Sequence, residues 1–165
     1  MTSDKEKNTI FPIDGIMISS VEAEIRKKNE LDLSLVSISE GSTVSGVFTT
    51  SKTRSPVIDI SEKNILSYTP KYLIINSGNA NAGLGKIGKK DVNEYCEYLS
   101  KRTNTGINEI CPFSTGVIGE RISVKNIKDK IPFLIDALDK NSWENFSKSI
   151  MTTDTFNKIV SKKIN

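Results

Sequence analysis

The chain has 165 residues, and 23 Lys and Arg against 20 Asp and Glu give it a net charge of +3. A chain of this length buries a substantial core, so we expect one globular domain or a part of one and exclude a disulfide-stapled miniprotein. It contains no histidine, and its two cysteines, Cys96 and Cys111, form no CxxC pair. These features exclude zinc fingers and catalytic triads that depend on histidine.

The charge pattern and the N-terminal segment bear on partners and location. Basic residues are interleaved with acidic ones, which argues against nucleic acid as the main partner. Residues 1–14 are predicted to be a polar extension ahead of a domain over residues 15–165. The sequence contains neither a signal peptide nor a run of about 18 apolar residues. We therefore expect a cytoplasmic protein with no membrane contact and with free thiols.

Apolar patterns predict strands in the first half of the chain. Residues 31–38 alternate apolar and polar side chains, as half-buried strands do, and residues 44–50 and 57–60 show the same pattern. Residues 72–75 form a short continuous apolar run, which is typical of a central strand. The stretch that follows, residues 76–83, is small and polar, so we expect no regular structure there.

The next part of the chain predicts a helix and then a strand. Asp91 is predicted to cap a helix that ends near Arg102 and has one apolar face, which includes Cys96. Residues 107–113 predict a short strand, which is expected to end at residues 114–116.

The last part of the chain predicts two helical regions. Ser123 is expected to cap the first, and Pro132 either kinks it or starts a second helix. The spacing of Trp143, Phe146 and Ile150 predicts one more short helix. With strands gathered early and helices late, we expect an α+β domain of layered strands and helices.

One glycine-rich segment matches nucleotide-binding patterns. Residues 83–88 (GLGKIG) satisfy GxGxxG, and Glu109 stands where a ribose-binding acid is expected. That pattern should follow its strand at once, however, and residues 76–83 intervene. A GxxxxGK match overlaps the same segment, but Lys90 stands where Ser or Thr would hold magnesium. We interpret the segment as a surface loop and keep nucleotide binding as a third hypothesis, which titration with ATP and NAD would test.

Three short polar segments carry residues suited to catalysis or binding: residues 76–82 (NSGNANA), 114–120 (STGVIGE) and 151–155 (MTTDT). The first two each follow an apolar strand, where loops often carry function. The Thr115 hydroxyl and the Gly116 N–H could direct two donors at one point, as a tetrahedral oxyanion requires. Each segment alone is also compatible with a turn or a helix cap.

Together and in this order, the three segments resemble the ornithine acetyltransferase family, also called bifunctional glutamate N-acetyltransferase, of arginine biosynthesis. Residues 31–36 and 46–50 are similar to that family's amino-terminal strands, and the likeness covers residues 15–158. The resemblance implies the amino-terminal part of that family's layered fold. It also implies a threonine nucleophile exposed by autocatalytic cleavage and a ping-pong transfer of acetyl from N-acetylornithine to glutamate.

The resemblance implies roles for individual residues. Thr115 and Gly116 match the family's oxyanion-hole pair, and Thr152 matches a substrate-binding position. Support of the site, without contact to substrate, is implied for a larger set: Asn76, Gly78, Asn79, Asn81 and Asp154. The resemblance implies no metal and no cofactor, with acetyl-CoA as a possible co-substrate.

The sequence departs from the family pattern in three places. Gly83 and Leu84 stand where the family commonly has Cys-Thr, and Asn157 replaces a proline. The sequence also ends at Asn165, before the family's Lys-Gly-rich loop and Ala-Thr scissile pair. We therefore expect an α-chain portion that is inactive alone and acts on N-acetylornithine and glutamate. Its expected partner is a β chain that carries the nucleophile, in an αβ hetero-oligomer.

A second hypothesis is a non-catalytic remnant, which keeps the first half of the fold as a binding or interaction module. The DNA beyond codon 165 discriminates between the two. A downstream frame that encodes the Lys-Gly loop and the Ala-Thr pair favours the enzyme, and a stop with nothing following favours the remnant.

Overall fold

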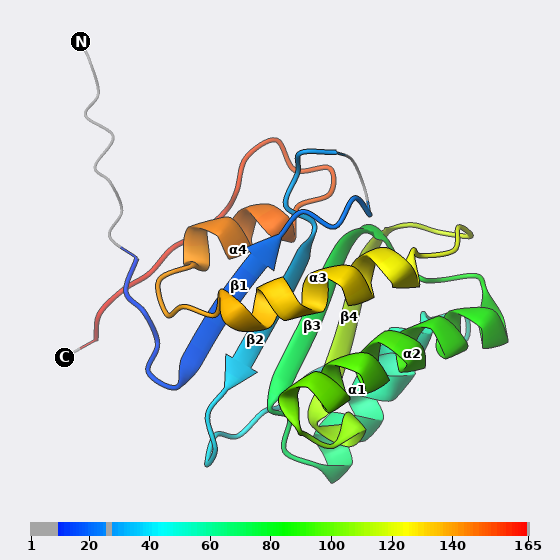
Figure 1. Ribbon diagram of the computed structural model, residues 1–165, viewed down its shortest axis with the longest axis horizontal. Helices are drawn as coiled ribbons and strands as arrows, with labels where there is room; N and C mark the ends of the chain where they lie inside the picture. Colours follow the sequence, from blue (N-terminus) through cyan, green and yellow to red (C-terminus); the bar gives the residue numbers. More distant parts are fainter. Residues whose placement is uncertain (1–9, 26–27, 165) are drawn as a thin grey trace.

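The computed structural model describes residues 10–25 and 28–164, in which a four-stranded sheet has the order β1-β2-β3-β4 (Figure 1). The strands are β1 (Ile16–Val21), β2 (Leu33–Ile38), β3 (Tyr72–Asn79) and β4 (Ile110–Val117). The helices are α1 (Pro56–Ser67), α2 (Gly85–Thr103), the short 3-10 helix η1 (Ile107–Glu109), α3 (Val124–Asp136) and α4 (Trp143–Ser149). Residues 1–9, most of the predicted extension, lie outside the described residues. None of the helices in these ranges is both long and apolar enough to cross a membrane.

The sheet combines two pairing directions. β2 is antiparallel to both β1 and β3, whereas β3 and β4 run parallel. α2 makes the crossover between the two parallel strands, which a connection of that kind requires. The carboxyl ends of β3 and β4 therefore lie at the same edge of the sheet.

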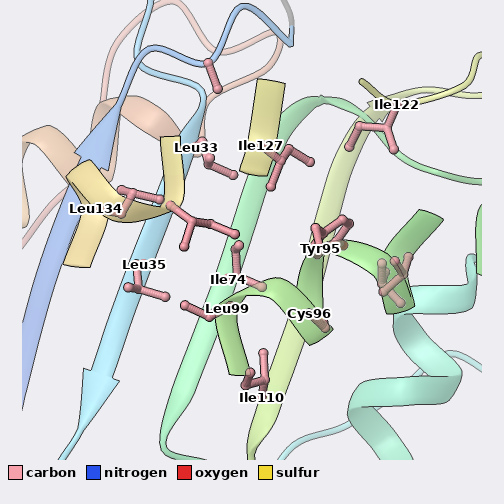
Figure 2. Packing of buried hydrophobic residues seen from close by; sticks show 14 residues of the cluster. Leu33, Leu35, Ile74, Tyr95, Cys96, Leu99, Ile110, Ile122, Ile127 and Leu134 are labelled. Carbon is pink, nitrogen blue, oxygen red and sulfur yellow. The ribbon is translucent and has the colours of Figure 1, made fainter. Parts of the chain in front are cut away.

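α2 and α3 cover one face of the sheet and enclose the main core. Figure 2 shows Leu35 and Ile74 of the sheet beside helix residues such as Leu99 and Leu134. Each of these four side chains is at most 2% exposed. Burial of an aliphatic side chain of this size contributes roughly 1.5–3 kcal/mol, so this layer supplies most of the apolar stabilisation.

α4 covers part of the opposite face. Successive strand residues point to opposite faces, so Val36 lies on the face that Leu35 does not reach. Val36 and Ile18 form a second apolar cluster, against which Trp143 and Phe146 of α4 pack. Their two rings meet edge to face, with centroids 6.5 Å apart. This packing fixes α4, and with it the start of the segment that follows.

Several predicted elements are confirmed. Residues 33–38 form β2, the apolar run at residues 72–75 lies in β3, and the short last helix is α4. The Ser123 hydroxyl accepts a hydrogen bond from a main-chain N–H in the first turn of α3, at 3.4 Å. Pro132 lies inside α3 without dividing it. The α+β fold class is also confirmed, although α1 and α2 lie between strands and not after them.

The strand predicted at residues 57–60 is wrong, because these residues belong to α1. Pro56 occupies the start of this helix, where no N–H partner is needed. Ser61 and Asn64 face inward, and their side chains donate to main-chain oxygens of β4 at 2.6 and 2.8 Å. Because polar residues lie on the inner face of this helix, its sequence does not show the apolar period typical of a helix.

The strand predicted at residues 44–50 is likewise wrong, since the described chain has no strand there. The segment is largely exposed, and Val47 is 100% exposed. An alternating pattern forms a strand only where a neighbouring strand pairs with its main chain. β1, by contrast, is a strand that the apolar pattern did not predict.

β3 is longer than predicted, and β4 begins and ends later than predicted, because residues 107–109 form η1 and not the start of the strand. Residues 76–79 and 114–117 were expected to be irregular, but they pair in register as the carboxyl-terminal halves of the two parallel strands. Gly78 lies opposite Gly116 in this ladder. The hydrogen bonds between paired strands join main-chain groups, so small polar residues can continue a strand when their side chains are hydrogen-bonded elsewhere. Two of the polar segments identified in the sequence are therefore neighbours in space.

α2 begins at Gly85, ahead of its predicted start at Asp91. Asp91 does not cap the helix: its side chain is 0% exposed and accepts two hydrogen bonds from Arg121, both at 2.8 Å. This bidentate pair fastens the loop after β4 to α2. Hydrogen bonding to Asp91 raises the pKa of Arg121 above its ordinary value.

We expect Arg121→Ala to destabilise the fold far more than Lys125→Ala, which breaks only the exposed Lys125–Asp129 pair. The loss of Arg121 leaves the Asp91 carboxylate buried without its cation, which is the costly way to break such a pair. Urea unfolding of both variants would check this, and equal midpoints would contradict it.

Candidate active site

A hollow of about 390 Å³ lies at the carboxyl ends of the two parallel strands. It contains three residues that the sequence singled out for catalysis or substrate binding: Thr115, Gly116 and Thr152. The remaining lining residues are Gly78, Val117 and Thr153. Segments that are far apart in the sequence thus form one site, with β3 and β4 on one side and the chain after α4 on the other.

Two glycines allow the strands to approach each other at this hollow. Gly78 has a φ of +97° and Gly116 a φ of +133°, a region that side chains disfavour. A Cβ on Gly116 would lie 2.3 Å from the carbonyl carbon of Gly78, which no real contact permits. The glycine pair therefore brings main chain, free of side chains, to the surface of the hollow.

Thr115 is exposed and lies directly before this glycine contact on β4. It points away from the face that bears Ser114, because successive strand residues alternate. No hydrogen bond between residues in the described part of the chain uses the Thr115 hydroxyl. Its proton therefore remains available to a ligand in the hollow.

The three asparagines after Ile75 are buried and support this edge from within. The Ser114 hydroxyl donates to Asn76 Oδ1 at 2.5 Å, and Asn76 Nδ2 donates to the Asn79 carbonyl at 2.8 Å. Asn79 Oδ1 accepts the Asn81 N–H at 2.7 Å. None of the three amides lines the hollow, so they stiffen the main chain that does.

The phenol of Tyr95 is buried beside Ser114. Tyr95 is 2% exposed and its hydroxyl is hydrogen-bonded with Ser114. Loss of water contact raises the pKa of Tyr95 well above its ordinary value, so the phenol stays protonated.

Asp154 lies beside the site but does not line it. Its carboxylate pairs with Lys158 at 2.5 Å, and this hydrogen bond is the main cause of its lowered pKa. The Thr152 N–H also donates to Asp154 and lowers that pKa further. Asp154 thus shapes the turn that carries Thr152.

The interpretation of residues 83–88 as a surface loop is wrong for residues 85–88, which form the first turn of α2. β3 extends to Asn79, so the gap before α2 is shorter than the sequence indicated. A Cβ on Gly88 would lie 2.9 Å from Asn81 Oδ1, and Asn81 Nδ2 donates to the Gly88 carbonyl at 3.0 Å. Gly88 is therefore needed for the close approach of Asn81.

Glu109 lies at the wrong end of the sheet for a ribose-binding acid. It directly precedes β4, whereas the glycine-rich segment follows β3, and the two strands are parallel. Its carboxylate pairs with Lys71 at 2.8 Å, which is the first cause of its lowered pKa, and the Gly106 N–H is the second. The arrangement that dinucleotide binding requires is absent from the described residues.

Neither cysteine contributes a reactive group. Both thiols are free and buried, as expected from the sequence. Burial raises the pKa of Cys111 to about 11 and raises that of Cys96 further. Within the described residues, no three His, Cys, Asp or Glu side chains gather closely enough to hold a metal ion.

Comparison with known proteins identifies the family. The family model described as "ArgJ family" matches residues 17–165. The chain belongs to the ArgJ family. This agrees with the resemblance carried by the three polar segments.

Curated relatives in the ArgJ family carry the name arginine biosynthesis bifunctional protein ArgJ. The relative from Methylococcus capsulatus is 35% identical over 146 residues, which cover 88% of this chain and 36% of the relative. The one from Psychrobacter arcticus is 34% identical over 157 residues, covering 95% of this chain and 39% of the relative. This chain thus spans little more than a third of the length of these relatives.

Solved ArgJ structures share the fold. An ornithine acetyltransferase from Mycobacterium tuberculosis, complexed with ornithine, superposes with a TM-score of 0.82 at 25% identity over 88% of this chain and 79% of that one. The ArgJ protein from Bacillus halodurans gives a TM-score of 0.79 at 24% identity, over 87% of this chain and 75% of that one. The layered fold expected from the resemblance is therefore confirmed.

We expect Gly116→Ala to disrupt the site and the fold. Its Cβ would overlap the main chain of Gly78, and overpacking costs about 1–3 kcal/mol or more beyond the strain of the backbone angle. Gly119→Ala is the matched control, since Gly119 also has a positive φ of +84° but open space around it. That control should lose only about 1–2 kcal/mol. Equal unfolding midpoints for the two variants would refute the role of the close approach.

Proposed function

We propose that this chain supplies the oxyanion hole and part of the substrate pocket of a glutamate N-acetyltransferase in arginine biosynthesis. The enzyme would move an acetyl group from N-acetylornithine to glutamate. The observation that carries the proposal is that Thr115, Gly116 and Thr152 line one hollow. Membership of the ArgJ family and the ornithine bound to a structural relative agree with it.

The first half of the reaction uses two donors on β4. A threonine hydroxyl at the N-terminus of a β chain attacks the acetyl carbonyl, and its own α-amine takes the hydroxyl proton. The Thr115 hydroxyl and the Gly116 N–H stabilise the negative charge that develops on the carbonyl oxygen. When the carbon–nitrogen bond breaks, the proton passes to the departing amine, which leaves as ornithine. The acetyl group remains on the threonine.

The second half reverses these steps with a different amine. The amino group of glutamate attacks the acetyl-threonine, the same two donors stabilise the oxyanion, and the threonine hydroxyl is regenerated. Thr152 lies across the hollow from β4 and would contact the amino-acid portion of the substrate. The steps need no metal or organic cofactor, and acetyl-CoA is proposed only as an additional acetyl donor.

The nucleophile and the rest of the pocket would come from the β chain. Val117, which lines the hollow, is 48% exposed, and its neighbour Ile118 is 69% exposed, so two adjacent apolar side chains face solvent beside the site. We propose that the β chain covers this surface in an αβ hetero-oligomer in the cytoplasm and that this chain alone is inactive. The non-catalytic remnant remains the alternative, since the chain spans little more than a third of its relatives.

Thr115→Ala, in a co-expressed pair of this chain and its β chain, should lower kcat about 100-fold, the usual effect of removing one oxyanion donor. KM for N-acetylornithine should change little, because the donor acts in the transition state. Thr115→Ser keeps the hydroxyl and should retain most of the activity. Steady-state kinetics would check this, and wild-type turnover in Thr115→Ala would remove Thr115 from the proposed role.

A further inference from the structure

Thr152 reaches the hollow from outside the sheet, so something must fix its distance from β4. It follows the end of α4, with only Ile150 and Met151 between it and Ser149. Ser149 is 2% exposed and lies in a group of four serines, one from each of β1, β2, β3 and α4. We call this group the serine cluster: Ser20, Ser34, Ser77 and Ser149.

The hydroxyls of the cluster form a directed chain into α4. The Ser149 hydroxyl donates to the Phe146 carbonyl at 2.8 Å, which leaves its oxygen to accept. Ser34 Oγ lies 2.5 Å from Ser149 Oγ, and Ser20 Oγ lies 2.8 Å from Ser34 Oγ. If Ser20 donates to Ser34 and Ser34 to Ser149, every hydroxyl proton in the chain has an acceptor. Buried hydroxyls satisfied in this way hold their elements firmly.

Ser77 makes the second link and connects both sides of the hollow. Its hydroxyl donates to the Ser149 carbonyl at 2.7 Å, and its N–H donates to the Asp32 carbonyl at 2.9 Å. Ser77 is 1% exposed and lies between Asn76 and Gly78, the latter of which lines the hollow. In the ladder it pairs with Thr115. One residue thus touches the end of α4 and belongs to the strand that faces Thr115.

The far side of the Thr152 segment is held by a separate contact. Asn157 Nδ2 donates to the Ser147 hydroxyl at 2.9 Å, so the chain is fastened to α4 on both sides of Thr152. Asn157 is one of the residues that departs from the family pattern. The serine cluster connects the start of this segment to the sheet.

We propose that Ser77 is a positioning residue, which sets Thr152 at its distance from Thr115 and Gly116 through the Ser149 carbonyl. The positioning role of Ser77 is inferred from its hydrogen bond to the Ser149 carbonyl and from the other hydrogen bonds of the serine cluster. Its consequence for substrate binding rests on the proposed function. Two independent measurements separate these parts.

The first measurement is hydrogen exchange on the whole chain. Ser77→Ala should speed exchange at the N–H groups of Ile150, Met151 and Thr152 about tenfold, the equivalent of one buried hydrogen bond. Ser19→Ala is the matched control, because the Ser19 hydroxyl is also 1% exposed and donates to a main-chain oxygen at 2.7 Å, but in α3. Ser19→Ala should leave these three amides within about twofold of wild type. An equal response to both variants, or none to either, overturns the proposal.

The second measurement is kinetic and uses the co-expressed pair with N-acetylornithine. Ser77→Ala should raise KM about five- to tenfold with kcat nearly unchanged, and Thr152→Ala should do the same. The double variant should be no worse than Thr152→Ala, because Ser77 acts through Thr152. Additive effects overturn the positioning role. If Thr152→Ala leaves KM unchanged, the substrate role of Thr152 fails, and the exchange experiment still decides the role of Ser77.

A further variant covers the case in which Ser77→Ala does not fold. Ser34→Ala removes the hydroxyl contact to Ser149 but leaves the Ser77 link in place. It should speed exchange at the same three amides by about two- to fivefold. Unchanged exchange there would contradict a positioning role for the cluster.

Discussion

The close approach of β3 and β4 at Gly78 and Gly116 is the constraint on which the rest of the site depends. With a side chain at Gly116, the parallel ladder would have to open before it reached Asn79 and Val117. The two polar segments would then separate as loops, and Thr115 would lose its fixed relation to β3. Because both residues are glycine, the ladder continues and ends in exposed main chain. A main-chain N–H held in this way is already oriented before a substrate binds, which is the condition for stabilising an oxyanion.

Buried polar groups give this edge its rigidity. The asparagine amides, the Ser114 hydroxyl and the Tyr95 phenol form one network behind β3 and β4, and the serine cluster forms another toward α4. In a medium of low polarity, each group is costly without a partner and firmly held with one. The first network lies behind the ends of β3 and β4, and the second connects the sheet to the end of α4, which precedes the segment that carries Thr152.

The sequence predicted the parts of the fold that depend on local pattern. Three local signals predicted their elements: the cap at Ser123, the apolar face that includes Cys96, and the apolar run at residues 72–75. Caps and apolar periods can be recognised within one short stretch of sequence. Residues 57–60 were mistaken for a strand, since Ser61 and Asn64 satisfy their polar groups only through the distant β4. The extension of β3 through Asn79 could not be predicted for the same reason. Thr115 and Gly116 were predicted from their side-chain and main-chain donors and matched by the family resemblance, whereas Thr152 was predicted from the resemblance alone. Ser77 lies in one of the polar segments, but its contact with the Ser149 carbonyl emerges only from the fold.

The proposed division of the enzyme between two chains is tested most directly by an acetyl-transfer assay with this chain, its β chain, and the co-expressed pair. Each would be supplied with glutamate and with N-acetylornithine that carries an isotopically labelled acetyl group, and labelled N-acetylglutamate would be measured by mass spectrometry. We expect label on glutamate only with the pair, because the proposal assigns the oxyanion donors and the threonine nucleophile to different chains. Transfer by the β chain alone at the rate of the pair, or no transfer by a well-folded pair, would contradict the proposed role of this chain.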